Sequence, residues 1–406
     1  MYREIKNNIS DSYRKNKDDL LALMFQIYPE FLYKKCDKIP TGEIPVFTFH
    51  SVEPASFERR MRYLADNNYE TLKGDAFYNI LTGRKKYIEN NVLLTFDDGV
   101  ESLWSTAYPI LKKYGMVAIS FIVTGRVREK STYYPNLEEV WKGKATIDEI
   151  RNRGKRAPLC SWEEIKEMHS SGTIDFQSHT YYHNSVFISD KIIDFINPAM
   201  KTDFIRSSLN PVIRRNGRDV VPEVLGLGRP IYEWSPAMKA SNRYLEDEAL
   251  GNECEKYVLE NGGIAFFTRF GWRRRLQGLV KNITRKNGHP GRFQSVDERY
   301  EEIRCDLFQS KMLIEEKLNK KVHHLCYPWY EGGDLSVNAS KETGYWCNHW
   351  GIMKDRAVNK VGDDPFFIAR IDGDYIDALP GKGRISAYEV FKKKVNDHDI
   401  KRIFFG

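Results

Sequence analysis

The sequence lacks the features that would place it across a membrane, outside the cell or on nucleic acid. No apolar run approaches the roughly 18 residues needed to cross a bilayer, and Met1 to Lys6 have no apolar segment typical of a secretory signal. The net charge of +7 over 406 residues is modest, so charge alone does not indicate nucleic-acid binding. We therefore expect a cytoplasmic protein, with peripheral membrane association left open and no nucleic-acid partner.

Cysteine is scarce and scattered. No C-x-x-C pair and no closely spaced framework is present among the six cysteines: Cys36, Cys160, Cys254, Cys305, Cys326 and Cys347. This distribution predicts reduced thiols rather than disulfides. With 41% hydrophobic and 29% charged residues, the composition is that of a globular protein, and the length exceeds one average domain.

The stretch from Val92 to Gly99 is the first with a clear chemical character. Its apolar part, Val92 to Phe96, predicts a buried strand that ends in Asp97, Asp98 and Gly99. Neighbouring side chains at a strand end point in different directions, so one aspartate can bind a metal while the other transfers a proton. Asp-Asp-Gly alone is more often a simple turn.

A second polar cluster follows in Ser178 to His183. On a helical turn, the four-residue spacing of His179 and His183 would place both imidazoles on one face. Together with an aspartate they would form a three-ligand site with room for water, which suits a catalytic divalent ion: Zn²⁺ first, with Co²⁺ or Ni²⁺ as alternatives. Each pattern alone is common in proteins without a metal site, but the two together favour one.

These two motifs resemble those of the NodB-homology polysaccharide deacetylases, carbohydrate esterase family 4. The resemblance extends through residues 161–179, similar to the family's helix and metal-binding strand, and through residues 302–329, similar to its later helix and groove motif. Val46 to Val52 predicts a strand that ends in His50, as in the circularly permuted branch of the family that includes enzymes acting on poly-N-acetylglucosamine.

The resemblance implies both a fold and a reaction. The fold is α/β, an irregular (β/α)7 parallel barrel with a large insertion. The reaction is metal-dependent removal of N-acetyl groups from an amino sugar in a glycan or glycan precursor. The implied metal ligands are Asp98, His179 and His183, the implied base is Asp97, and the implied acid is His50.

The resemblance implies that a loop over Pro328, Trp329 and Tyr330 lines the sugar-binding groove. In the family, the backbone N–H of the residue after the proline, here Trp329, stabilises the oxyanion. Many relatives carry a base-orienting arginine two residues before this proline, where this chain has Cys326. We expect Arg370 to replace it, and group it with the substrate-side residues. Cys326 has no activating partner in the sequence to make it a nucleophile, and His349 is expected to be structural.

Turn residues and changes in composition predict five segments. Residues 1–40 would form an N-terminal extension with a helix over Asp18 to Leu32. Residues 41–183 and 295–385 would form the two parts of the catalytic barrel, with 184–294 as an insertion or lid. Residues 386–406 would form a basic tail with a surface helix.

The insertion has a basic stretch of its own. Between Asn261 and Val296 the chain has eight Lys or Arg and no Asp or Glu. This is either a solvated face or a docking site for an anion, such as the diphosphate of a nucleotide- or lipid-linked sugar or an acidic membrane surface.

Two other functions stay open from the sequence. The same residues would serve a deformylase or another amidohydrolase acting on a small or carrier-linked amino sugar. A non-catalytic glycan- or lipid-binding protein on this fold would not need the base and the acid.

Overall fold

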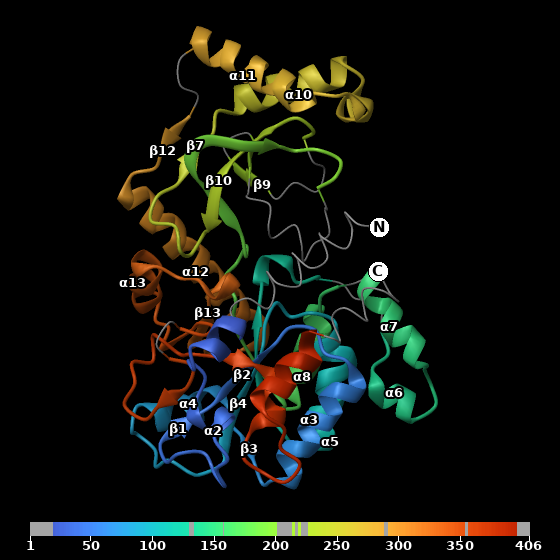
Figure 1. The fold of residues 1–406 in the computed structure, drawn as a ribbon, viewed down its shortest axis with the longest axis vertical. Coiled ribbons are helices and arrows are strands. Elements are labelled where there is room, and N and C mark those ends of the chain that lie inside the picture. Colours follow the sequence, from blue (N-terminus) through green and yellow to red (C-terminus); the bar gives the residue numbers. More distant parts are fainter. Residues whose placement is uncertain are drawn as a thin grey trace. The chain divides into compact units, whose positions relative to one another are not determined.

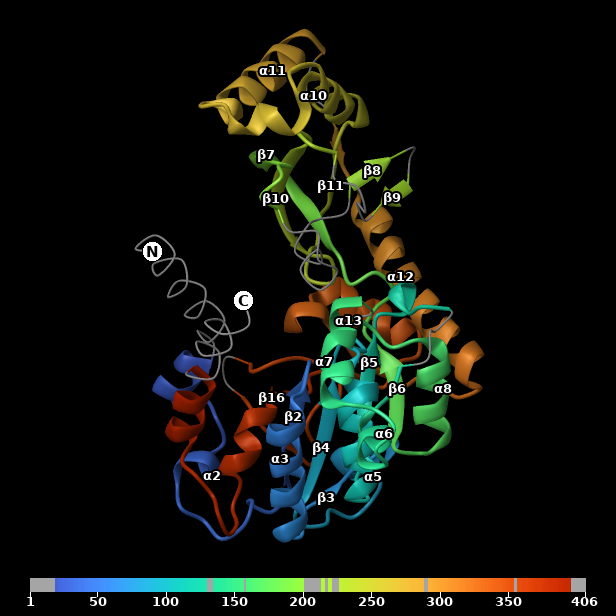
Figure 2. The ribbon, with the colours of Figure 1, turned by 90° about the vertical axis from the view of Figure 1, so that its right-hand side faces the viewer.

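The computed structural model describes residues 19–129, 134–156, 158–200, 213–215, 218–220, 226–287, 291–353 and 356–395. The chain forms two compact units (Figures 1 and 2). The first comprises the chain up to Tyr181, Ser310–Tyr330 and the chain from Gly344 onward; the second comprises Tyr182–Gln309 and Glu331–Thr343. Of the described helices, none has the length and apolar character needed to traverse a bilayer.

A curled parallel sheet forms the centre of the first unit. Seven strands follow one another in the order β14-β13-β6-β5-β4-β2-β16, and β3 (Glu70–Thr71) pairs with the start of β4. Every neighbouring pair along this path is parallel. The strands are β2 (Val46–Phe49), β4 (Asn91–Phe96), β5 (Ala118–Ile122), β6 (Ile174–Ser178), β13 (His324–Cys326), β14 (Cys347–His349) and β16 (Ile371–Asp372).

The last part of the chain connects the two edges of this sheet. The N–H of Ile368 donates to the carbonyl of Asn348 in β14, and the N–H of Trp350 donates to the carbonyl of Ile368. A few residues later, β16 pairs with β2 at the opposite edge. The sheet therefore curls into a barrel-like form, and the predicted irregular α/β barrel is confirmed.

Helices cover the outside of this sheet in the first unit (Figure 2). They alternate with the strands along the chain, as expected for parallel strands joined by crossovers. The α-helices are α2 (Glu30–Tyr33), α3 (Pro54–Asp66), α4 (Gly74–Leu81), α5 (Tyr108–Lys113), which continues η1 (Leu103–Ala107), α6 (Leu137–Trp141), α7 (Ile147–Arg156) and α8 (Trp162–Ser170). Short turns elsewhere in this unit are η2 (Thr124–Arg126), η4 (Pro328–Tyr330) and η5 (Gly373–Ala378).

The barrel core explains why its strands have nearly unbroken apolar sequences. Every residue of β2 and β4 is buried, because helices cover the outer face while other strands fill the inner one. Val46, Leu93, Ile119 and Phe121 pack with Phe77 of α4 in one cluster. The polar residues that matter for chemistry follow directly after these strands.

Two helix predictions need correction. The expected helix over Asp18 to Leu32 is interrupted: within its described part, residues 19–24 are helical and α2 begins only at Glu30. Gln26 has φ 53° and Pro29 precedes α2, and neither favours a continuous helix. The periodicity of apolar residues predicts a later helix over Glu301 to Leu318, but this helix, α12 (Val296–Leu318), begins five residues earlier.

The start of α12 is set by a reciprocal cap. The N–H of Glu298 donates to Ser295 Oγ at 3.1 Å, and the N–H of Ser295 donates to the Glu298 carboxylate at 2.8 Å. This Ser-x-x-Glu pattern is a capping box, so the sequence did contain the information.

The predicted basic surface helix at the C-terminus is helical over residues 387–395, the part the structure describes. Lys394, however, is mostly buried and donates to Asp19 and Asp372 at 2.5 Å each. Lys394 is therefore tied to Asp19 and Asp372 of the first unit.

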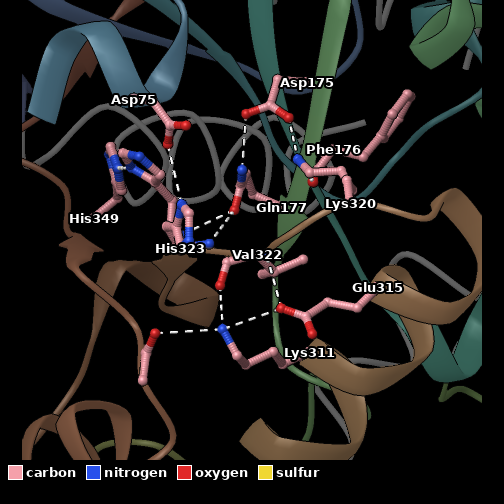
Figure 3. Close-up of polar contacts among 12 residues, drawn as sticks. Asp75, Asp175, Phe176, Gln177, Lys311, Glu315, Lys320, Val322, His323 and His349 are labelled. Atoms are coloured by element: carbon pink, nitrogen blue, oxygen red, sulfur yellow. Dashed lines mark hydrogen bonds and ion pairs between the residues drawn. The ribbon is translucent and has the colours of Figure 1, made fainter.

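A polar network joins β6 to the segment that leads into β13 (Figure 3). Gln177 Oε1 accepts from the backbone N–H of His323 at 3.0 Å and of His324 at 2.9 Å, while Gln177 Nε2 donates to Asp175 at 2.8 Å. Lys320 binds the same Asp175. These contacts hold the strand that carries Cys326 in register with the strand that precedes His179.

An antiparallel ribbon and two helices form the second unit. Strand β7 (Ser185–Phe195) pairs with β10 (Pro230–Pro236), and β11 (Tyr244–Leu245) pairs with β12 (Arg292–Phe293). Helices α10 (Glu248–Glu260) and α11 (Trp272–Asn287), joined by η3 (Gly263–Thr268), pack on Phe195 of β7. The other elements of the second unit are β8 (Ile213–Arg215), β9 (Arg218–Val220) and α13 (Asp334–Glu342).

The first unit has one further pair of strands, in which β1 (Glu43–Ile44) pairs with β15 (Asn359–Lys360).

Candidate active site

The two aspartates after β4 lie in different surroundings. Asp97 is 1% exposed, and its backbone N–H donates to the carbonyl of Phe49 at 2.9 Å, which extends the pairing of β2 and β4. Asp98 has φ 68° and a partly exposed side chain. The left-handed turn at Asp98 thus separates the environments of the two carboxylates, as two different roles would require.

Arg370 binds the buried carboxylate of Asp97 with both ends of its guanidinium. Its Nη1 donates to Oδ1 at 2.7 Å and its Nη2 to Oδ2 at 2.8 Å. The carbonyl of Trp350 accepts from Arg370 Nε at 2.9 Å, and Thr95 Oγ1 accepts at 3.1 Å. The contact expected between Arg370 and the candidate base is therefore present, and Trp350 and Thr95 are supporting residues that sequence analysis missed.

This contact governs the charge of Asp97. Burial alone would raise the pKa of the Asp97 carboxyl, but the Arg370 guanidinium outweighs burial and holds this pKa below its usual value. Arg370 itself has a raised pKa because the carboxylate offsets its burial. Asp97 is therefore held ionised, as a base must be before it accepts a proton.

Cys326 lies against the same pair. Its sulfur is 2.9 Å from Arg370 Nη2 and 3.6–3.7 Å from the Asp97 oxygens. Burial raises the pKa of the Cys326 thiol, which keeps it protonated and a poor nucleophile. Cys326, at the position where many relatives have an arginine, therefore contacts the candidate base Asp97. The positive charge beside this base comes from Arg370.

Asp98, His179 and His183 form the first candidate metal set. Each offers one ligand atom, and the three atoms lie within 4.8 Å of one another. His179 Nε2 is 3.4 Å from Asp98 Oδ1, while His179 Nδ1 is 2.9 Å from the carbonyl of Cys326. Because a carbonyl can only accept, Nδ1 carries the proton and Nε2 presents its lone pair on the side of Asp98.

The segment between the two histidines is not the helical turn that the spacing suggested. Strand β6 ends at Ser178, and residues 179–183 are irregular. Thr180 has φ 67° and His183 has φ 51°. A left-handed bend brings the two imidazoles together instead. The expected helical turn is therefore wrong, while the ligand role of both histidines stays a prediction.

The donor set fits a divalent ion. Two N/O ligands about 2.1 Å from a tetrahedral ion lie about 3.4 Å apart, which is the separation of His179 Nε2 and Asp98 Oδ1. Two imidazoles and one carboxylate suit zinc, and cobalt or nickel accept the same donors.

Asp97, His179 and Cys326 form a second set of potential ligand atoms within 4.8 Å. Both oxygens of Asp97 are already bound by Arg370. A cation among these three would also face the guanidinium, which repels it. The set with Asp98 is therefore the better candidate.

His50 follows β2 and is exposed. Its ring lies edge-on to Tyr330, with the centroids 6.1 Å apart, and its positive charge when protonated contributes to the lowered pKa of Asp97. His50 is therefore within electrostatic range of Asp97 and exposed to solvent, and its role as the acid stays a prediction.

The predicted groove loop has an unusual backbone. Pro328 is buried, whereas Trp329 and Tyr330 are partly exposed and have φ values of 52° and 63°. Two consecutive bulky residues in this region each cost on the order of 1–3 kcal/mol and are concentrated at functional sites. The Tyr330 ring covers the Arg370 guanidinium at 5.2 Å. Substrate binding by these residues stays a prediction.

His349 does not join the metal set. It is fully buried, and its Nε2 lies 3.0 Å from Nδ1 of His324, which is also fully buried. His349 was expected to be structural, but its partner His324 was not predicted from the sequence. The pairing of β13 with β14 sets these side chains together.

Comparison with known proteins finds a family match for part of the chain. Residues 84–210 match the family model described as polysaccharide deacetylase. The chain is 38% identical over 97 residues to the Bacillus subtilis protein YxkH, covering 22% of this chain and 35% of that protein. It is 32% identical over 138 residues to the poly-beta-1,6-N-acetyl-D-glucosamine N-deacetylase of Staphylococcus aureus, covering 33% of this chain and 39% of the relative. The chain thus spans less than half the length of these curated relatives.

Solved structures also resemble the chain. A de-N-acetylase from Aggregatibacter actinomycetemcomitans matches with a TM-score of 0.48 and 17% identity, over 86% of this chain and 99% of that one. The matched segment 84–210 contains Asp97, Asp98, His179 and His183. Within this segment the chain is similar to the polysaccharide deacetylase family.

Proposed function

We propose that this protein is a metal-dependent hydrolase that removes N-acetyl groups from an amino sugar in a glycan or glycan precursor. The observation that carries the proposal is the separation of two carboxylates at one strand end. Asp97 is held ionised by Arg370, while Asp98 belongs to a distinct ligand set with His179 and His183. A deacetylase needs both a base and a metal ligand at this place.

The proposed metal ligands are Asp98, His179 and His183. A divalent ion bound there, zinc in the first instance, would polarise the amide carbonyl and lower the pKa of a bound water. The hydrogen bond from His179 Nδ1 to the Cys326 carbonyl would orient the ring for this task.

Protons are moved by the chain's own residues. Asp97 accepts a proton from the attacking water, because Arg370 keeps it ionised. The backbone N–H of Trp329 donates to the oxygen of the tetrahedral intermediate. His50 protonates the departing nitrogen, so that the C–N bond breaks to give a free amino sugar and acetate.

The proposed substrate is a glycan of N-acetylated amino sugars. The Staphylococcus aureus relative, by its name, acts on poly-beta-1,6-N-acetyl-D-glucosamine, and this supports the substrate class. Nucleotide- or lipid-linked precursors, a peripheral membrane contact through residues 261–296 and a cytoplasmic location belong to the same proposal. All six cysteines are free thiols, which is consistent with a reducing compartment.

The test is amine release from N-acetyl and N-formyl amino sugars, free, oligomeric, nucleotide-linked and lipid-linked, together with metal analysis. We expect metal-dependent release from N-acetyl oligomers and none from Asp97→Asn. Arg62→Gln is a matched control, because Arg62 is an exposed side chain on α3 outside the site.

Each alternative predicts a different outcome of this screen. Release from N-formyl sugars alone would assign a deformylase. Binding of a glycan or lipid without release from any substrate, in protein that contains its metal, would assign a non-catalytic binder and overturn the proposal.

A further inference from the structure

The connection between α10 and α11 in the second unit exposes large apolar side chains. Phe270 is 98% exposed, Leu259 is 74% exposed and Ile264 is 68% exposed. The three lie at the end of α10, in η3 and just before α11, and we call them the apolar tip. Single exposed apolar residues are common, but three large ones within twelve residues of chain are candidates for contact with a partner.

A basic stripe lies along the adjoining helix. Arg274, Lys281 and Arg285 of α11 are spaced to share one face of the helix, and all three are exposed. Leu276 and Ile283, on the opposite face, pack into the core of the second unit. Within the described residues, no carboxylate forms an ion pair with the three stripe residues, whereas Arg273 binds Asp194.

An apolar groove borders this stripe. It has a volume of about 540 Å³ and lies between β7 and α11. Ile192, Phe195 and Val280 line it together with the stripe residues Lys281 and Arg285. The second unit therefore offers apolar and cationic groups side by side on one element.

We propose that the apolar tip and the basic stripe dock the second unit on the surface of an anionic lipid bilayer. The stripe contacts lipid headgroups by charge complementarity, and the tip inserts Phe270 and Ile264 into the boundary between headgroups and acyl chains. This inference deepens the peripheral membrane contact proposed above for residues 261–296 by assigning its residues and its lipid class. It does not depend on deacetylation, because none of the candidate catalytic residues belongs to the tip or the stripe.

The aliphatic members of the tip favour a bilayer over a soluble polyanion. An acidic glycan or a nucleic acid could neutralise the stripe, and a base could stack on Phe270. Neither provides an apolar interior for Leu259 and Ile264, whereas a bilayer receives aliphatic and aromatic side chains at the depth where cations meet phosphates.

The test is co-sedimentation of the full chain with vesicles of phosphatidylcholine alone or with about 30% phosphatidylglycerol, at low and high salt. We expect binding only to the anionic vesicles, weakened by salt. Phe270→Ser should weaken this binding about tenfold, and the charge reversal Arg274→Glu with Lys281→Glu by about a hundredfold. Arg285→Glu provides a second, independent charge variant.

Matched controls distinguish the loss of this particular surface from a general change in the protein's net charge or exposed apolar area. Lys85→Glu with Lys86→Glu makes the same change in net charge at two exposed lysines of the first unit, and Tyr388→Ser removes an aromatic side chain that is 71% exposed. Both should bind like the unaltered protein. The proposal is overturned by absence of binding to anionic vesicles, by equal binding to neutral ones, by equal loss in the controls, or by loss on charge reversal without loss in Phe270→Ser. None of these experiments measures deacetylase activity, so absence of vesicle binding would not contradict the proposed reaction.

Discussion

Arg370 donates one hydrogen bond to each oxygen of the buried Asp97 carboxylate, at 2.7 and 2.8 Å. Such a forked contact fixes the direction of the carboxylate as well as its charge. Both side chains are almost fully buried, so neither has water as an alternative partner. The state of the candidate base therefore depends on a residue 273 positions further along the chain.

Replacing Arg370 by methionine should move the acidic limb of the pH–rate profile to higher pH. The guanidinium lowers the pKa of Asp97, so its loss raises this pKa, and the base becomes protonated at a pH where it was ionised before. We expect a shift of one pH unit or more, since an adjacent arginine lowers an aspartate pKa by about 1–3 units. The measurement is kcat/KM against pH, and an unmoved acidic limb would refute the assigned role of Arg370.

Variants of Asp97 and of Asp98 should both lose activity, but only the Asp98 variant should also lose its bound metal. Asp97→Asn removes the proton acceptor, so kcat should fall by about 10²-fold or more, while bound metal stays near the level of the unaltered protein. Asp98→Asn and His183→Ala should lose metal and activity together, and added metal should restore part of the activity. Metal loss in Asp97→Asn, with retention in Asp98→Asn, would reverse the two roles.

The site residues could be predicted from sequence because each lies in a short motif at a strand end. A buried run such as Val92 to Phe96 predicts a strand, and the residues that follow parallel strands meet at one edge of the sheet. Arg370 could be suggested because Cys326 left the expected arginine position empty. A local pattern was sufficient for the residues that follow β4 and β6, whereas Arg370 was inferred from the missing arginine at position 326.

Features that depend on distant parts of the chain were not predictable in this way. The spacing of His179 and His183 is the same on a helix and in a bend, so the sequence did not distinguish the two. The contact between His324 and His349 depends on the pairing of β13 with β14, which the sequence of either strand does not specify. Likewise, Trp350 and Thr95 support Arg370 only because the sheet curls.

Gly99→Ala should destabilise the protein more than Gly83→Ala does. Both glycines have positive φ, 68° and 71°, so alanine costs about 1–2 kcal/mol at each from the backbone alone. At Gly99 a Cβ would also lie 2.9 Å from Ile122 Cγ2, whereas at Gly83 nothing lies within 4 Å. This crowding should add about 1–3 kcal/mol and disturb Asp98 next to it. The measurement is the free energy of unfolding by urea, and equal values for the two variants would contradict the packing at the motif.

The buried pair His324 and His349 should make the protein sensitive to acid. Burial lowers the pKa of His324 to about 4 and that of His349 well below its usual value. An unfolded histidine has a pKa of about 6.5, so between pH 6.5 and 4 the unfolded chain takes up protons that the folded chain does not. The free energy of unfolding should therefore fall as the pH falls from 6.5 to 4, by on the order of 3 kcal/mol for His324 alone. Above pH 6.5 the pair causes no such loss of stability.

His324→Gln tests this assignment because glutamine keeps a polar group but does not titrate. The decline in the free energy of unfolding between pH 6.5 and 4 should be shallower in His324→Gln than in the unaltered protein, by about the contribution of one histidine. His323→Gln is the matched control, since His323 is the adjacent residue, partly exposed, with its ring stacked on Trp346 at 3.4 Å. All three proteins are measured in chelator, so that metal binding at Asp98, His179 and His183 does not contribute to the difference between slopes. If His323→Gln flattened the decline as much as His324→Gln did, the acid sensitivity would not belong to the pair in the barrel core.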